Sequence, residues 1–393
     1  MIWFGFVLAV VVLMLLSRSN LAIALFSAAV LLGIFTFDLH QIGSAFYRTF
    51  TDPSIILLAI VVGLIPIIGG LLEHSGQMDD LVDHLHIGER AFFVISPGLL
   101  GMLPMPGGAL LSAPLLAKGS KTPISDSKKV AINVWYRHVF ILIYPLAPAL
   151  IASAKIAGLD VYRIIPYLIP GFLLSFVIGF QFWIRHLSGG DRMQKPVTKE
   201  SMLPIGIILL APAADLFFHA LGIFQVREMA TLIGVSLSLT LALLTSPLRL
   251  RDLYAIGKEM HAVRFAGIIF GMFLFLHVFQ GTSIPNQLEH FPLSPVVLCV
   301  LIGFVLGFVT GRIQVPVSII VPIFLVKFGV LTLAAFAVMY FSVFLGYVIS
   351  PVHPCVAVSI EYFNITFRKY IETIALPTFL AFLPVLIVAF FIF

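Results

Sequence analysis

The sequence predicts an all-α integral membrane protein with about ten transmembrane helices, two re-entrant hairpins and two inverted-topology repeats. Three observations lead to this fold class: the composition, two interrupted apolar stretches, and residue matches at one fixed offset. Of the 393 residues, 60% are hydrophobic and 10% are charged, and the mean hydropathy is +1.11. Soluble domains carry roughly 25% charged residues, so this composition is typical of a polytopic membrane protein.

Apolar runs close to the ~20 residues that cross a bilayer recur along the chain. We expect spans at residues 2–16, 21–37, 54–72, 130–156, 161–185, 202–219, 228–245, 263–280, 331–358 and 372–393. Two further stretches, 91–118 and 294–327, are interrupted at their centres by PMPGG and TGRIQVP. Each half is too short to cross, and irregular backbone at membrane depth is tolerated only where protein or water surrounds it. We therefore expect two re-entrant hairpins.

Internal matches divide the chain into two halves. His84 and His290, Gly101 and Gly307, Pro145 and Pro351, and Pro148 and Pro354 are each 206 residues apart. Each half would hold five spans and one hairpin, and an odd number of crossings inverts the second half. We expect a first repeat at 1–185 (scaffold spans 1–72, hairpin 91–118, broken span 130–156), a cytoplasmic linker at 186–201, and a second repeat at 202–393 (scaffold spans 202–280, hairpin 294–327, broken span 331–358).

The positive charges predict an orientation. With both termini outside, sixteen of the 23 Lys and Arg residues fall inside and five outside, which satisfies the positive-inside rule. We expect a multi-pass protein of the cell (inner or plasma) membrane. The two remaining arginines, Arg137 and Arg312, fall within membrane segments.

The interruptions combine residues that end helices with residues that start them. Proline lacks an amide donor, and glycine permits tight turns. The helix-breaking positions are Pro104, Pro106, Pro145, Pro148, Pro316, Pro351 and Pro354, with Gly107 and Gly108 at the tip of the first hairpin. Four helix N-termini would then converge near the bilayer midplane, and such ends bind anions. The alternative is that these residues only kink packed helices.

Arg312, at the tip of the second hairpin, is the sharpest candidate for substrate binding. Its planar fork could clamp a carboxylate or other oxyanion; alternatively, it forms a salt bridge or caps backbone carbonyls. His353 could donate to an anion or carry a proton, or instead bond carbonyls freed by the break. Arg137 and His138 lie about two turns inside their span, and Arg137 could snorkel to the interface.

Further polar or small residues lie at or near the breaks, and each hydroxyl alone is more often a local backbone partner than a ligand contact. They are Ser112, Tyr144, Thr310, Gly311, Gln314, Ser318 and Ser350. We expect no cofactor beyond a coupling Na⁺ or H⁺, no resident metal and no catalytic residue. The arm at residues 73–90 lacks metal-ligand spacing and predicts an amphipathic surface helix. Asp215 and His219 predict a structural pair, and Cys299 and Cys355 imply no disulfide framework.

These features resemble the ion transporter superfamily of secondary carriers, which includes gluconate, citrate and dicarboxylate permeases. The resemblance is closest to an uncharacterised prokaryotic integral membrane family within it. The motifs are GMLPMPGGALLSAP, YRHVFILIYPLAP, GFVTGRIQVPVSIIVP and YVISPVHP. The resemblance implies a homodimer with a scaffold domain and an elevator-type transport domain. Sodium-coupled dicarboxylate carriers of this group have Ser-Asn-Thr motifs where this sequence has Pro-Met-Pro-Gly-Gly and Thr-Gly-Arg.

The sequence thus predicts a secondary active transporter, not an enzyme, for a small organic anion such as a carboxylate or sugar acid, coupled to H⁺ or Na⁺. The alternative is a cation/proton antiporter, which the absence of acidic residues at the expected breaks disfavours. We expect as partners the anionic substrate, the lipid bilayer and a second copy of the chain. Nucleotide-binding motifs are absent, and we expect no nucleic-acid partner.

Overall fold

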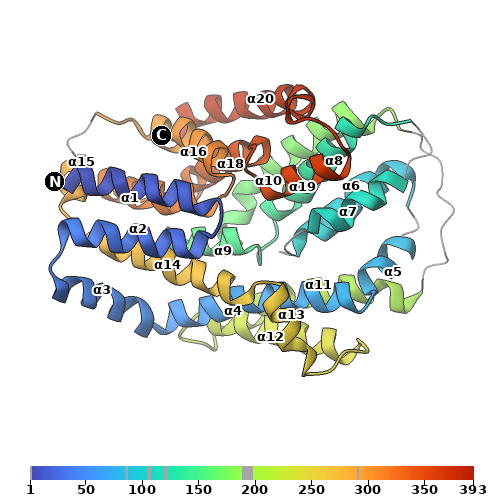
Figure 1. The fold of residues 1–393 in the computed structure, drawn as a ribbon, viewed down its shortest axis with the longest axis horizontal. Helices are drawn as coiled ribbons and strands as arrows, with labels where there is room; N and C mark the ends of the chain where they lie inside the picture. Colours follow the sequence, from blue (N-terminus) through green and yellow to red (C-terminus); the bar gives the residue numbers. More distant parts are fainter. Residues whose placement is uncertain (1, 85–86, 104–107, 119–122, 188–197, 290–291) are drawn as a thin grey trace.

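The computed structural model describes residues 2–84, 87–103, 108–118, 123–187, 198–289 and 292–393 (Figure 1). In these ranges the regular secondary structure is helical, without a β-strand. Six helical segments are long and apolar enough to cross a membrane: Pro53–His74, Val161–Ile184, Ser201–Leu221, Ala262–Gly281, Leu333–Tyr362 and Phe367–Ile392. The predicted all-α, membrane-type fold is confirmed at this level, whereas the number of crossings, their orientation and the particular membrane stay predictions.

One group of helices, here called the first bundle, combines the beginning of both halves of the chain. Its members are α1 (Ile2–Ser17), α2 (Leu21–Thr36), α3 (Leu39–Thr51), α4 (Pro53–His74), α11 (Lys199–Leu221), α12 (Glu228–Leu244), α13 (Asp252–Glu259) and α14 (Ala262–Gly281). Helix α2 packs on α14, and α4 packs on both α14 and α12. Asp52 caps α4 by accepting hydrogen bonds from backbone amides of its first turn, and Pro53 occupies the first helical position.

Most of the remaining helices form the second bundle. They are α6 (Glu89–Met102), α7 (Gly108–Lys118), α8 (Asp126–Val139), η1 (Phe140–Leu142), α9 (Pro148–Ile156), α10 (Val161–Gly179), η2 (Phe180–Ile184), η3 (Val297–Ile302), α16 (Gly303–Thr310), α17 (Gln314–Phe328), α18 (Leu333–Ile349), α19 (Pro354–Tyr362) and α20 (Phe367–Ile392). Two short helices are assigned to neither bundle: α5 (Gln77–His84) follows α4 along the chain, and α15 (Ile284–Glu289) follows α14. Helix α5 buries Met78, Leu81 and Val82, as an amphipathic surface helix should.

Several helices of the second bundle are interrupted. Helix α6 is 14 residues long, about 21 Å at 1.5 Å per residue, shorter than a hydrocarbon core of about 30 Å. Helix α7 is described over 11 residues. Helices α16 and α17 are separated at Gly311, whose φ of +58° suits glycine. Pro148 and Pro354 begin α9 and α19 after non-helical turns. The linker predicted at 186–201 lies mostly outside the described residues.

The interrupted helices of the two halves begin at matched positions. Two pairs of first residues are each separated by 206: Pro148 and Pro354, and Val161 and Phe367. The capping residues of the last pair, Asp160 and Thr366, are separated by the same interval, and each side chain accepts from a first-turn amide. Gly108, the first described residue of α7, and Gln314, the first residue of α17, are separated by the same interval. The offset found in the sequence is therefore also an offset between helix boundaries.

The closest helix crossings occur at matched glycines. A Cβ atom at Gly101 would lie 2.0 Å from the Arg137 carbonyl oxygen, and one at Gly307 would lie 2.3 Å from the Val343 carbonyl oxygen. These crossings, α6 on α8 and α16 on α18, again lie 206 residues apart. Only glycine lets the backbones approach this closely.

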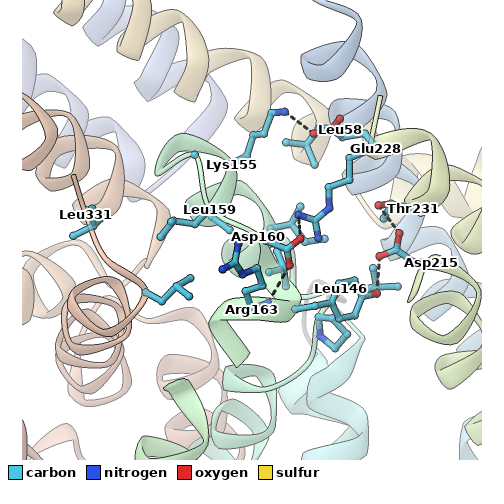
Figure 2. Close-up of a pocket in the computed structure, with 18 of the residues that line it drawn as sticks. Leu58, Leu146, Lys155, Leu159, Asp160, Arg163, Asp215, Glu228, Thr231 and Leu331 are labelled. Carbon is cyan, nitrogen blue, oxygen red and sulfur yellow. Dashed lines mark hydrogen bonds and ion pairs between the residues drawn. The ribbon is translucent and has the colours of Figure 1, made fainter. Parts of the chain in front are cut away.

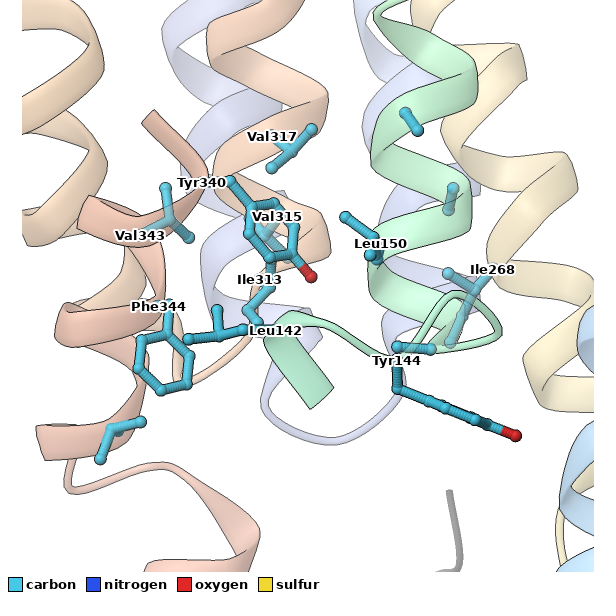
Figure 3. Close-up of a cluster of buried hydrophobic side chains, with 14 of the residues drawn as sticks. Leu142, Tyr144, Leu150, Ile268, Ile313, Val315, Val317, Tyr340, Val343 and Phe344 are labelled. Carbon is cyan, nitrogen blue, oxygen red and sulfur yellow. The ribbon is translucent and has the colours of Figure 1, made fainter. Parts of the chain in front are cut away.

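An apolar cluster joins the broken segments of the two halves (Figure 3). Leu142 and Leu150, from η1 and α9, pack with Val315 of α17 and with Val343 and Phe344 of α18, and all five are fully buried. The cluster fixes the ends of the interrupted helices relative to one another, and so it positions the polar groups beside them.

We predict that Gly101→Ala and Gly307→Ala each destabilise the protein, because overpacking at a tight crossing costs about 1–3 kcal/mol. The measurement is thermal unfolding of the purified protein in detergent. Gly206→Ala is the matched control, since Gly206 lies exposed in a helix and an added methyl group meets nothing within 4 Å. Equal melting temperatures for all three variants would contradict the assigned crossings.

Candidate functional site

A buried arginine lies where two helices of the second bundle meet. Arg137, near the end of α8, is 4% exposed. Its Nη1 donates a hydrogen bond to the carbonyl of Gly108, the first described residue of α7, at 2.9 Å. A Cβ on Gly108 would lie 2.1 Å from Nη2, so only glycine admits the guanidinium at this position. The sequence-predicted residues Arg137 and Gly108 are thus in direct contact.

Two histidines from different halves of the chain pack against each other beside Arg137. The ring centroids of His138 and His353 are 4.5 Å apart, and the Tyr347 ring stacks on His353 at 3.9 Å. His138 donates from Nδ1 to the Val134 carbonyl at 2.6 Å. His353, at 0% exposure, has no hydrogen-bond partner for either ring nitrogen among the described residues. An unpaired polar group at such depth is costly unless a ligand satisfies it.

The chain around the two histidines is electropositive. His353 directly precedes α19, and Gly108 is the first described residue of α7, so the N-terminus of α19 and the first described turn of α7 adjoin Arg137 and His353. Among the described residues, no carboxylate forms an ion pair with Arg137 or Arg312. The carboxylate of Glu73 in α4 interacts with Arg137 electrostatically at longer range, without forming an ion pair with it. The centre therefore carries positive charge without a matching anionic side chain among the described residues.

Arg312 uses its side chain differently from Arg137. Its Nε donates to the carbonyl of Ser17, the last residue of α1, at 2.9 Å. This is the backbone-capping contact that the sequence left open as the alternative to an oxyanion clamp, and the clamp stays a prediction. The neighbouring Gly311 packs on the backbone of His353, where a Cβ would lie 2.8 Å from the His353 nitrogen. The α16–α17 break is therefore adjacent to the histidine pair.

Most of the other predicted hydroxyl groups bond nearby carbonyls. Three of them bond a carbonyl three or four residues earlier in their own helix: the acceptors of Ser112, Thr310 and Ser318 are Ala109, Leu306 and Val315. Ser350 instead joins two helices by donating to the Phe308 carbonyl of α16. Gln314 opens α17 and Pro316 lies in its first turn, while Pro351 lies in the turn before α19. Tyr144 turns away from the apolar cluster (Figure 3) and donates to the Ile208 carbonyl of α11 at 3.2 Å. Pro104, Pro106 and Gly107 lie outside the described residues.

Asn133 is a second polar group with unused capacity in this region. Its Nδ2 donates to the Ala109 carbonyl of α7 and to Ser359 Oγ of α19, at 3.2 and 3.0 Å. Its buried Oδ1 has no partner among the described residues. The short helices α7 and α19 are therefore held against α8 by one amide, whose oxygen remains available as an acceptor for a ligand or a coupling ion.

A cavity of about 550 Å³ separates the two bundles (Figure 2). Pro145, a predicted break residue, lines it with Lys155 and Asp160 on the side of the second bundle. Glu228, Thr231 and Asp215 line the side of the first bundle. The cavity thus separates the broken segments of one bundle from the helix ends of the other.

Ion pairs join the two bundles across this cavity. Lys155 Nζ lies 2.6 Å from Glu228 Oε1, and Asp160 pairs with both Arg227 and His219. The predicted partnership of Asp215 with His219 is wrong. Although both side chains lie on one face of α11, Asp215 accepts from Tyr162 at 2.6 Å and Thr231 at 2.9 Å, whereas His219 reaches Asp160.

Sequence reasoning missed two residues of the centre, Tyr347 and Cys355. Tyr347 stacks on His353, and the Cys355 thiol lies against the Arg137 guanidinium. Cys355 is two residues from His353 and Tyr347 is one helical turn before the break, so proximity to the SPVHP motif was the available signal. No comparable sequence pattern predicted the ion pairs that line the cavity.

Residues 4–392 match a family described as "Protein of unknown function (DUF401)". The chain belongs to this family. A comparison with curated proteins finds no match. Because the family match runs through nearly the whole chain, it includes both bundles and every residue of the centre, and it assigns them no activity.

We predict that the Lys155–Glu228 pair contributes coupled stability. Glu228→Gln or Lys155→Gln alone leaves a partly buried charge without its partner, and the double variant removes both charges. Thermal unfolding should show that the double variant loses less stability than the sum of the two single losses. Strict additivity would mean that the two charges do not interact in solution.

Proposed function

We propose that the protein is a secondary active transporter of a small organic anion, either a carboxylate or a sugar acid. The observation that carries the proposal is the buried Arg137, placed beside the N-terminus of α19 and the first described turn of α7, without an ion-paired carboxylate among the described residues. A guanidinium and free amides at helix starts together complement a carboxylate. A buried cation without a counter-charge is expensive, and a bound anion would compensate it.

The arrangement of the chain supports transport more than simple binding. Matched helix boundaries and matched glycine crossings at one offset support two repeats, which secondary transporters commonly place in inverted orientation. The cavity lies between a bundle of interrupted helices and a bundle of mostly continuous ones. We assign these to a transport domain and a scaffold of an elevator-type homodimer, by analogy with the superfamily that the sequence resembles.

Within this proposal the residues have different roles. Arg137 binds the anion, and Gly108 keeps the space beside the guanidinium open. His353, with two unpaired nitrogens, donates to the anion or carries the coupling proton. Asn133 Oδ1 is the acceptor available to a coupling Na⁺ or to a hydroxyl of a sugar acid. Arg312 holds the broken helix against α1 and adds positive charge from the side.

A cation/proton antiporter is the alternative, and it would need an acidic site. The carboxylates at the cavity are Asp160, Asp215 and Glu228, and each is occupied by basic or hydroxyl partners. This distribution favours the anion carrier. A sodium efflux driven by a pH jump in liposomes, without any organic anion, would favour the antiporter.

We predict that one class of organic anion raises the melting temperature of the purified wild-type protein and that Arg137→Gln loses this response. Loss of one charge-assisted hydrogen bond, worth about 1.5–3 kcal/mol, should weaken binding at least about tenfold. Arg137→Lys should recover part of the affinity, because it restores charge without the planar fork.

Arg163→Gln is the matched control, since Arg163 lines the cavity with an exposed side chain. It should retain wild-type affinity and uptake in proteoliposomes. An Arg137→Gln protein that remains folded and binds the anion with unchanged affinity would refute the assignment of Arg137. A wild-type protein that takes up no carboxylate, sugar acid or oxyanion would refute the proposed function.

A further inference from the structure

His353, which belongs to the proposed anion site, also forms a cluster with His138 and Cys355, two residues without a role in the proposed transport. One ring nitrogen from each histidine and the sulfur of Cys355 all lie within 4.8 Å of one another. With metal–nitrogen bonds of about 2.0 Å and a metal–sulfur bond of about 2.3 Å, ligand atoms around one ion are roughly 3.3–3.7 Å apart. A contraction of about 1 Å would therefore bring the three atoms into a coordination sphere. The side chains come from α8 and from the start of α19, so the site would join both halves of the chain.

The protonation of the histidines suits metal binding. Because Nδ1 of His138 donates to the Val134 carbonyl at 2.6 Å, its Nε2 carries the free lone pair in the neutral ring. A carbonyl bonded to the second nitrogen is the usual support of a metal-bound histidine. His353 is fully buried, and neither of its nitrogens is hydrogen-bonded within the described residues. Two imidazole nitrogens are therefore available beside one thiol.

We propose that His138, His353 and Cys355 bind one soft monovalent metal ion, Cu⁺. Two imidazoles and a thiolate are a ligand set for soft d¹⁰ ions, and sulfur selects Cu⁺ over hard cations. Three ligands are enough for trigonal Cu⁺, so the site needs no fourth residue. Cys355 is half-buried, and it is the most exposed of the three residues, since both histidines are buried.

The charge of the surroundings favours a monovalent ion over Zn²⁺. The Arg137 guanidinium lies against the Cys355 thiol, and its charge favours the thiolate form, which burial of the thiol opposes. When Cu⁺ binds, it displaces the thiol proton, which leaves for the solvent, so the net charge of the site does not change. Zn²⁺ would add one positive charge near Arg137 and Arg312, which is unfavourable in a low-dielectric interior.

The test is a Cu⁺ titration of the full-length protein in detergent, without oxygen, after removal of any polyhistidine tag. Competition with the chromophoric chelator bicinchoninate measures the affinity and the stoichiometry. We expect one Cu⁺ per chain, and at least about tenfold weaker binding in Cys355→Ser and in His353→Gln. X-ray absorption of the bound copper should show two nitrogen ligands and one sulfur ligand.

The chain offers matched controls for both ligand types. Cys299 is a buried cysteine in η3, and His277 of α14 is engaged with Thr49 at 2.8 Å. Cys299→Ser and His277→Gln should bind Cu⁺ as the wild type does. Ag⁺ should raise the melting temperature of the wild type and not that of Cys355→Ser, and the melting temperature without metal shows whether each variant folds.

Three results would overturn the proposal: a wild-type protein that retains no Cu⁺, equal binding by Cys355→Ser, or equal losses in Cys299→Ser and Cys355→Ser. Binding of Zn²⁺ as tightly as Cu⁺ through the same residues would overturn the charge argument. The titration contains no organic anion. A failure of the metal site is therefore distinguishable from a failure of anion transport, which is measured without metal.

Discussion

The burial of one guanidinium is the constraint on which the arrangement of the centre depends. Arg137 can remain charged in an apolar interior only if nearby groups accept its hydrogen bonds and a negative charge can approach. Gly108 supplies the carbonyl and lacks the Cβ that would collide with Nη2. Gly101 brings α6 onto the backbone of Arg137 itself. Gly108 is thus explained by the guanidinium that it admits, and Gly101 by the close approach of α6 to the backbone of α8.

The two halves share their backbone plan but not their chemistry. At an offset of 206, Arg137 corresponds to Val343, His138 to Phe344, and Cys355 to Ala149. The glycine crossings and helix starts are matched, whereas each of the residues Arg137, His138 and Cys355 has an apolar counterpart in the other half. The matched backbone positions therefore explain how broken helices of both halves converge. The side chains that differ between the two halves give the centre its chemistry.

Composition and apolar runs were enough to predict the long apolar helices, and proline or glycine marked where some of these helices are interrupted. Boundaries such as Pro148 and Pro354 agree with the sequence pattern since proline suits the first turn and lacks an amide. The amphipathic α3 and the short α13 were not predicted, since neither reaches the length of a span. Contacts were harder to predict than helices, because they depend on packing between segments that are distant in the sequence. Arg312 donates to a backbone carbonyl of α1, and Cys355 contacts Arg137, and no local sequence pattern predicts either contact.

The most direct test of the account is a cryo-electron microscopy map of the protein in lipid nanodiscs with a stabilising anion bound. The account predicts ligand density against the Arg137 guanidinium, between the start of α7 and His353. Density in the cavity around Asp215, or against Arg312 with Arg137 turned to the aqueous phase, would contradict it.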